Sequence, residues 1–483
     1  MAVFKKSAII AFLAFAAGAS AFAPANTVPA VNEMKTSNVM PLNVRAGGSK
    51  LQMAAASAAM EKPSEGNSSG GEGTMSALTF NLVKSIVGAG VLSLPAGIAA
   101  FGNAPSAIVP AVALITVFGG LSAYSFSLIG RLCAWTNSNS YTQAWENSVG
   151  KASSNIPSIS CTFMTVCATL AYSMILADTI QAIFASFGLV LSRTASLLGI
   201  TSTILLPLCL LKNLASLAPF SLLGIIGMVY TAFAMGARYL GGAYASPSGV
   251  FLPDLAANLQ PAFGDIGAAG VFSPNALILV CMLSNAFMAH FNAPKFYNEL
   301  KDNTVKRFNT LVGSSFAISV LFFIALTAFG FLTFGANSSG LILNNYSTKD
   351  SLMGLSRIAV AISLVFSYPL AFAGCRDGIL DLLNVPAEKR TDGLLNKVTV
   401  TALAGITGLA LVVKDLTLVS SLGGALLGNA LIYLYPPFMF RAAVKKMGDK
   451  ATKGLKREVK FALANAGLGI TLAVIGTKAA LKL

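Results

Sequence analysis

Charged residues are scarce in this sequence. Only 11% of its 483 residues are Asp, Glu, Lys or Arg, whereas 55% are hydrophobic, and the mean hydropathy is +0.72. So much apolar surface is more than one water-soluble core can bury, which argues against a soluble enzyme. Histidine occurs once, as His290, and this excludes a zinc site built from several histidines.

Several motifs of enzymes and pumps are also missing. The chain contains no CxxC pair and no HExxH, and its six cysteines lie singly, most of them inside apolar stretches. It has no GxxxxGK[ST] loop, which a nucleotide-driven pump needs to hold phosphates. Carboxylates in the apolar stretches are too sparse for an aspartyl dyad. We therefore expect no catalytic residue, no metal and no cofactor.

Basic residues outnumber acidic ones. The chain has 33 Lys and Arg against 18 Asp and Glu, a formal net charge of +15. A nucleic-acid surface would gather these cations on a polar domain, but here they lie in short gaps between apolar runs. The pattern indicates a chain oriented in a lipid bilayer, with no nucleic-acid partner.

The N-terminal segment is typical of a targeting sequence. Two lysines precede an apolar run of about twelve residues, which ends at a small-residue cleavage site. We predict a signal peptide at 1–21, a transit-peptide-like segment at 22–53 and a flexible tail at 54–77 that is rich in Gly, Ser and Glu. The junction before Phe22 resembles the bipartite presequences of plastid proteins, which implies a plastid membrane. An ordinary secretory signal, with a secretory or vacuolar membrane, is the alternative.

Residues 78–483 form a series of apolar runs long enough to cross about 30 Å of hydrocarbon as helices. We expect an all-α polytopic membrane protein with about eleven spans, at 78–101, 106–132, 156–187, 195–211, 215–239, 273–293, 306–333, 351–373, 393–413, 416–439 and 457–477. Lys and Arg gather in alternate gaps. The positive-inside rule then places the N-terminal side of the first span inside and, with an odd number of spans, the C-terminus outside.

The first span is interrupted at its centre. Gly88, Ala89 and Gly90, followed by Pro95, favour unwinding of the helix at mid-membrane depth. Unwound backbone is tolerated there only where it lines a cavity, and its free N–H groups suit a carboxylate. Close helix packing through small residues is the alternative reading of the same glycines.

The sixth span is interrupted in a similar way. Asn285, His290 and Asn292 lie just ahead of Pro294 in an otherwise apolar run. Paired broken helices at corresponding positions of two halves indicate an inverted-repeat transporter with its site at the interface. The sequence fits a five-plus-five repeat with one extra helix.

These features together resemble the amino acid/auxin permease family from about residue 78 to 477. The matching stretches, in chain order, are NLVKSIVGAGVLSLP, LPLCLLKNLASLAPFSLLGII, APKFYNELK, FGFLTFG, YPLAFAGCRDGI and SLGGALLGNALIYLYPP. The resemblance implies secondary active transport of amino acids, driven by a proton or sodium gradient. It also implies that the substrate is held between the broken first and sixth helices.

The resemblance assigns roles to individual residues. It implies that the backbone at Gly88, Ala89 and Gly90 holds the substrate carboxylate. It further implies that Phe287, His290 and Phe291 face the amino group or the side chain. The aromatic lining expected there favours neutral amino acids.

The coupling ion is where the sequence departs from part of the family. Sodium-coupled members carry Asn four residues before the first Gly of the GxG, and this chain has Lys84 there. A fixed ammonium disfavours a bound sodium ion. Proton-coupled and vacuolar members often carry Lys at this position, so the resemblance favours proton coupling, and Ser367 is slight support for a sodium site. A side chain that only snorkels inward is the alternative for Lys84.

Two further residues are candidates for the proton pathway. His290 titrates near neutral pH when unperturbed, but a structural histidine is an equal alternative. Asp178 is a candidate proton carrier, and we prefer a structural role for it because it lies late in its span.

A transporter-like amino acid sensor is the main competing function. We expect little polar chain outside the spans to hold a signalling partner, which argues against it.

Overall fold

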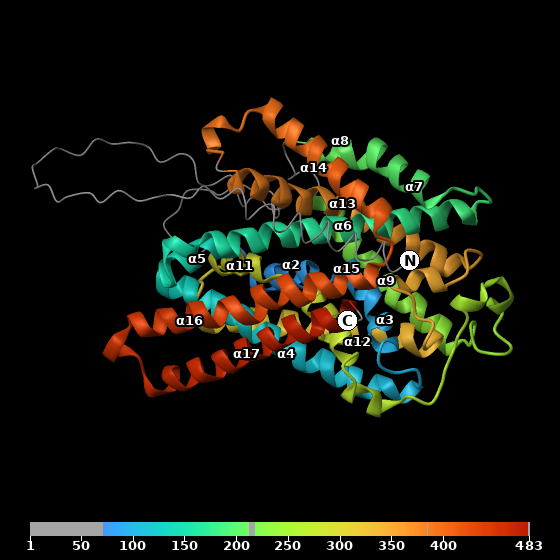
Figure 1. Cartoon of the computed structure of the whole chain (residues 1–483), viewed down its shortest axis with the longest axis horizontal. Coiled ribbons are helices and arrows are strands. Elements are labelled where there is room, and N and C mark those ends of the chain that lie inside the picture. Colours follow the sequence, from blue (N-terminus) through green and yellow to red (C-terminus); the bar gives the residue numbers. More distant parts are fainter. Residues whose placement is uncertain (1–70, 212–217, 384, 482–483) are drawn as a thin grey trace, which may run out of the picture. The chain divides into compact units, whose positions relative to one another are not determined.

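The computed structural model describes residues 71–211, 218–383 and 385–481, and in these ranges the chain is almost entirely helical (Figure 1). No strand occurs among these residues, only two isolated β-bridges. The predicted signal peptide, the transit-like segment and most of the predicted tail lie outside the described residues. The all-α fold that the apolar runs predict is confirmed.

The first half of the chain holds five helical segments. Their elements are α2 (Met75–Ile86), η1 (Ala89–Ser93) and α3 (Leu94–Ala99); η2 (Pro105–Ala107) and α4 (Ile108–Thr136); α5 (Tyr141–Ser148), η3 (Lys151–Ser153) and α6 (Asn155–Ser186); α7 (Arg193–Ile200), η4 (Thr201–Leu205) and α8 (Leu206–Cys209); and α9 (Ala218–Leu240).

The second half begins with three short helices and continues through six further segments. Its elements are η6 (Leu252–Asp254), η7 (Ala257–Leu259) and η8 (Ala268–Phe272); α10 (Ala276–Ala286), η9 (His290–Asn292) and α11 (Ala293–Glu299); α12 (Val305–Phe334); η10 (Ile342–Asn345) and α13 (Ser351–Leu382); η11 (Ala387–Lys389) and α14 (Asp392–Val412); α15 (Leu416–Gly423), η12 (Gly424–Gly428), η13 (Ala430–Leu434) and α16 (Tyr435–Lys446); and η14 (Gly448–Lys450) and α17 (Lys453–Leu481).

Eight helices in the described ranges are long and apolar enough to cross a membrane, and the bent first pair makes a ninth. The predicted count of eleven also includes α9 and the shorter apolar helix at Arg193–Cys209, and it stays a prediction. The five-plus-five repeat stays a prediction as well. The long helices run side by side in Figure 1, with α6 against α13 and α16 against α17.

Both predicted helix breaks are present. The first lies at Gly88, whose backbone is extended (φ −108°, ψ −177°), so α2 and α3 meet at an angle of about 40°. Pro95 is the second residue of α3 and lies in its first turn, where its missing N–H removes no helical hydrogen bond. The second break separates α10 from η9, and Pro294 lies in the first turn of α11.

The tenth span is distorted in a different way. Two π-helical segments, η12 and η13, lie between α15 and α16, and π-helical turns leave the ordinary hydrogen-bond register without interrupting the helix. Gly424 lies so close to α10 that a Cβ there would be 1.7 Å from the carbonyl oxygen of Cys281. This glycine therefore permits the close approach of two helices.

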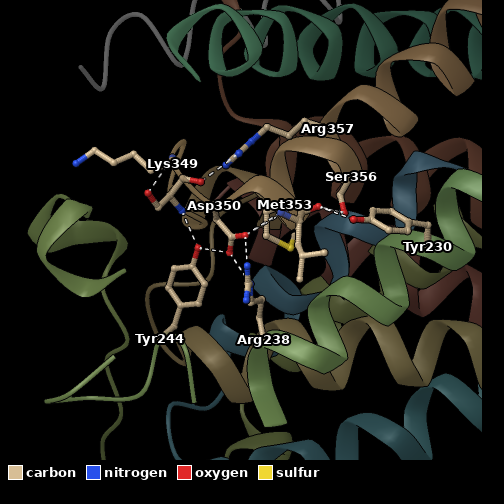
Figure 2. A network of polar contacts seen from close by, with 10 residues as sticks. Tyr230, Arg238, Tyr244, Lys349, Asp350, Met353, Ser356 and Arg357 are labelled. Atoms are coloured by element: carbon tan, nitrogen blue, oxygen red, sulfur yellow. Dashed lines mark hydrogen bonds and ion pairs between the residues drawn. The ribbon is translucent and has the colours of Figure 1, made fainter. Parts of the chain in front are cut away.

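Charged residues hold the loop between α12 and α13 in place, as Figure 2 shows. The buried carboxylate of Asp350 accepts hydrogen bonds from Arg238 Nε and Nη2 at 2.9 and 2.7 Å and from Tyr244 Oη at 3.0 Å. Arg357 donates to three carbonyl oxygens of the same loop at 2.6 to 3.2 Å. We call these four residues the loop clasp.

The clasp also fixes the start of α13. Asp350 caps this helix by accepting hydrogen bonds from the backbone N–H groups of Leu352 and Met353. Burial and the neighbouring Asp350 carboxylate raise the pKa of Tyr244, so its hydroxyl stays protonated and keeps donating.

Candidate functional site

A cavity of about 290 Å³ lies at the break of the first span. Its walls come from α2 and the first break, from α6, from the second break with α11, and from α13 and α15. Small-molecule sites commonly have volumes of about 300–1,000 Å³, so this cavity is suited to a small ligand. The lining residues include Lys84, Gly88, Gly90, Tyr172, Asn285 and Phe291.

The two glycines of the first break open onto the cavity. A Cβ at Gly90 would meet nothing within 4 Å, and one at Gly88 would meet only Tyr172 Oη, at 3.9 Å. Neither glycine has a positive φ, so neither is required by backbone strain. Their small size instead leaves room for a ligand to reach the main chain.

The main chain at this break has hydrogen-bonding capacity to offer. The N–H of Gly88 bonds to Ile86 O at 3.0 Å, and that of Val91 bonds to Gly88 O at 3.3 Å. Between them, Ala89 and Gly90 occupy the first positions of η1, where N–H groups have no acceptor within the helix. The break therefore directs donors to a position suited to an anion.

Polar side chains surround the glycines from other helices. Tyr172 and Thr165 reach the cavity from α6, and Ser420 reaches it from α15. Asn285 lines it at the end of α10, next to the carbonyl groups that the break leaves at the negative end of the helix dipole. Asn292 also lines the cavity and donates to Ser85 Oγ at 3.3 Å, which joins the two breaks.

Three charged residues line the cavity. Lys295 and Glu299 form an ion pair across one helical turn, at 3.4 Å. Lys84 forms no ion pair with a carboxylate of the described residues. The lining thus carries one ammonium group in excess over its carboxylates.

Apolar side chains form the remaining wall. Ile86, Met164, Ile175, Met288 and Phe291 all line the cavity. Such a wall accepts an uncharged apolar group and offers a cation no carboxylate partner.

His290 and Phe287 do not line the cavity in the described structure. His290 is fully buried on the opposite side of the break, where its Nε2 lies 2.9 Å from the carbonyl oxygen of Ser122 and its ring packs edge-on against Phe126. Phe287 is also fully buried, with its ring 4.7 Å from that of Phe323. Both residues pack the break against α4 and α12.

The remaining predicted residues divide between the cavity and its surroundings. Ser367 lines the cavity from α13. Asp178 lies elsewhere, because its carboxylate accepts hydrogen bonds from Arg193 Nε at 2.6 Å and Asn344 Nδ2 at 3.3 Å. Ala89 lies at the start of η1, between the two lining glycines. No three His, Cys, Asp or Glu residues in the described ranges come together as a metal site.

The third span contributes to the cavity, which the sequence-based prediction of the site did not include. Thr165, Ala168, Tyr172 and Ile175 follow one another at helical spacing along one face of α6, and all four line the cavity. This mixture of small, polar and aromatic residues on one face was a usable signal. Asn285 was noted only as part of the interruption, although it reaches the cavity itself.

The chain is similar to known amino acid transporters. The profile of the family described as "Transmembrane amino acid transporter protein" matches residues 71–481. "Putative sodium-coupled neutral amino acid transporter 11" of Mus musculus is 25% identical over 398 residues, which cover 80% of this chain and 82% of that protein. "Vacuolar amino acid transporter 7" of Saccharomyces cerevisiae is 25% identical over 317 residues, which cover 65% of this chain and 60% of that protein.

One solved structure covers most of the chain. The crystal structure of MhsT in complex with L-phenylalanine aligns with 86% of this chain and 99% of its own, at 10% identity and a TM-score of 0.48.

Proposed function

The chain belongs to the transmembrane amino acid transporter family, and from this premise we propose that the cavity at the first break is where its amino acid binds. The observation that carries the proposal is the open space at Gly88 and Gly90, next to main-chain donors. A substrate there lies between the two broken helices, where a small rearrangement opens it to either side of the membrane. The chain is therefore a carrier and not an enzyme.

The two ends of an amino acid fit the two breaks. The carboxylate binds at the N–H groups of Ala89 and Gly90, at the positive end of a helix dipole. The ammonium group binds near Asn285, at the carbonyl end of α10. This assignment replaces Phe287 and His290 with residues that line the cavity.

The side chain of the substrate is neutral in this proposal. Phe291, Met288 and Ile175 offer it an apolar wall. The one carboxylate among the lining residues is that of Glu299, which is paired with Lys295. A cationic substrate therefore finds no separate partner, which agrees with the name of the mouse relative.

We propose that protons drive the transport. Lys84 lines the cavity, and a fixed ammonium repels a sodium ion in its neighbourhood. His290 and Asp178 have structural roles in this proposal, since each is bonded outside the cavity. Sodium coupling is the second candidate, and the hydroxyl of Ser367 in the cavity and the name of the mouse relative favour it.

The identity of the cellular membrane that holds the protein is a separate proposal. The chain is a multi-pass membrane protein, and the presequence-like segment at 1–53 supports a plastid membrane. A fluorescent protein fused after residue 53 tests this address. Fluorescence in plastids supports the proposal, whereas fluorescence in the secretory pathway or the vacuole overturns it.

Uptake into proteoliposomes tests the function. A mixture of labelled amino acids is offered with an imposed pH gradient in one arm and an imposed sodium gradient in the other. Accumulation of neutral amino acids in the pH arm alone is the expected result. Accumulation in the sodium arm alone overturns proton coupling, and uptake in neither arm favours a sensor.

A further inference from the structure

The turn between α16 and α17 carries an unusual density of positive charge. Between residues 441 and 460 there are eight Lys and Arg residues and two acidic residues, and all eight cations are exposed. We call this segment the basic turn. Its position at one end of two adjoining helices is visible in Figure 1.

The two acidic residues of the basic turn neutralise little of its positive charge. Glu458 is engaged by Arg131 from α4, whose Nη1 and Nη2 donate to its two carboxylate oxygens at 2.5 and 2.9 Å. Asp449 is the other acidic residue of the turn. The surface therefore retains a strong positive potential, which attracts anions.

A crevice of about 480 Å³ opens beside the basic turn, between α4, α5 and α16. Trp135, Asn147 and Lys446 are among its lining residues. Lys446 Nζ donates to the backbone oxygen of Asn147 at 2.8 Å, so the ammonium group is held over the crevice with two further N–H groups to offer. Tryptophan is the side chain typical of the level at which lipid headgroups lie.

An exposed apolar strip lies further along α17, on the side that carries Lys456 and Lys460. It includes Ile470 and Val474, which are 51% and 56% exposed and lie four residues apart on the helix. A molecule with an anionic head and apolar tails is complementary to a surface on which cations are followed by exposed apolar side chains. A nucleic acid or an acidic peptide matches only the charged part.

We infer that the basic turn and its crevice bind the phosphate headgroup of an anionic phospholipid, whose acyl chains lie along the apolar face of α17. Lys446 contacts the phosphate inside the crevice, and Lys450 and Lys453 approach it from the turn. This site is separate from the cavity at the first break, so it is tested without any transport measurement.

Binding of fluorescent phosphatidylglycerol to the full chain in neutral detergent tests the inference, with phosphatidylcholine as the comparison lipid. The variant K446Q/K450Q/K453Q removes three cations from the site. The variant K349Q/K414Q/K478Q removes three exposed cations elsewhere and is the matched control. A third variant, K446R/K450R/K453R, keeps the charge. Size-exclusion chromatography shows which variants are folded.

The expected result is preferential binding of phosphatidylglycerol that the three Gln substitutions weaken by about a hundredfold, at about fivefold for each lost cation. The control and the Arg variant bind as the wild type does. Equal binding of both lipids, or equal binding by the wild type and the Gln variant, overturns the inference. Millimolar inorganic phosphate is a further arm: full competition identifies free phosphate as the ligand and also overturns it.

Discussion

The glycines of the first and tenth spans look alike in sequence but lie in opposite surroundings. A Cβ at Gly90 would enter open space, whereas one at Gly424 would come within 1.7 Å of a backbone oxygen of α10. The sequence left both readings open for the first span, a cavity or close helix packing. The structure shows the cavity in the first span and close packing in the tenth. A run of small residues thus indicates a position where the backbone needs space beside it, but it does not distinguish a cavity from a closely packed helix.

Charged groups show the same contrast between a closely packed position and a position that faces the cavity. Asp350 in the loop clasp is fully buried, and its oxygens accept hydrogen bonds from two side chains and the start of α13. Lys84 lines the cavity and has no carboxylate partner among the described residues. Groups whose bonds are complete hold the fold, whereas groups that face a cavity without a partner are available to a ligand.

Replacement of Gly424 by Ala has the largest expected effect. The new methyl group meets backbone, which cannot rotate away, so α10 and the tenth span must separate. We expect a loss of stability above about 4 kcal/mol and little folded protein on size-exclusion chromatography. The matched control is Gly408→Ala, since a Cβ there meets nothing within 4 Å. A Gly424→Ala protein as stable as this control would show that the two helices can adjust.

Asp350→Ala comes next in size. The change leaves Arg238 without its partner and removes the cap of α13, and breaking such a buried ion pair costs about 3–5 kcal/mol. Thermal unfolding in detergent measures the loss. Asp254→Ala is the control, because its partner Lys349 is 74% exposed and a surface pair contributes about 0–1 kcal/mol. Equal losses in the two variants would mean that burial of the clasp adds nothing.

Gly90→Val affects transport and leaves the fold intact. A larger side chain fills space that the proposed substrate site needs, and a Cβ at this position meets no other part of the protein within 4 Å. We expect the melting temperature of the wild type and uptake reduced by more than about a hundredfold, as when a bound group is displaced. Gly120→Val, on an exposed position of α4, is the control for the mutation itself. Normal uptake by a folded Gly90→Val protein would remove this glycine from the site.

The sequence predicted the helical fold and the two breaks well, because glycine, proline and polar residues inside apolar runs have few explanations. It predicted less of the site. His290 and Phe291 are adjacent in sequence, yet His290 faces α4 and Phe291 faces the cavity. Which way each residue faces depends on the 3₁₀ geometry of η9, and apolar periodicity does not specify this. The composition of one face of α6 indicates a special position for Tyr172, but only the arrangement of α6 beside the first break shows that this face lines the cavity.

Lys84→Gln has the smallest expected effect, because it changes the energetics of coupling and leaves the substrate contacts in place. Gly88 is about 6 Å from Lys84 along the helix axis, at 1.5 Å per residue, so the carboxylate site survives the change. We expect exchange of labelled substrate across the membrane to continue, while accumulation driven by a pH gradient falls by about tenfold. Lys397→Gln, which changes an exposed cation outside the cavity, is the control. Full accumulation by Lys84→Gln would mean that this lysine only snorkels toward the membrane surface. The contrast between groups that line the cavity and groups that are packed would then be supported by the glycines and no longer by Lys84 and Asp350.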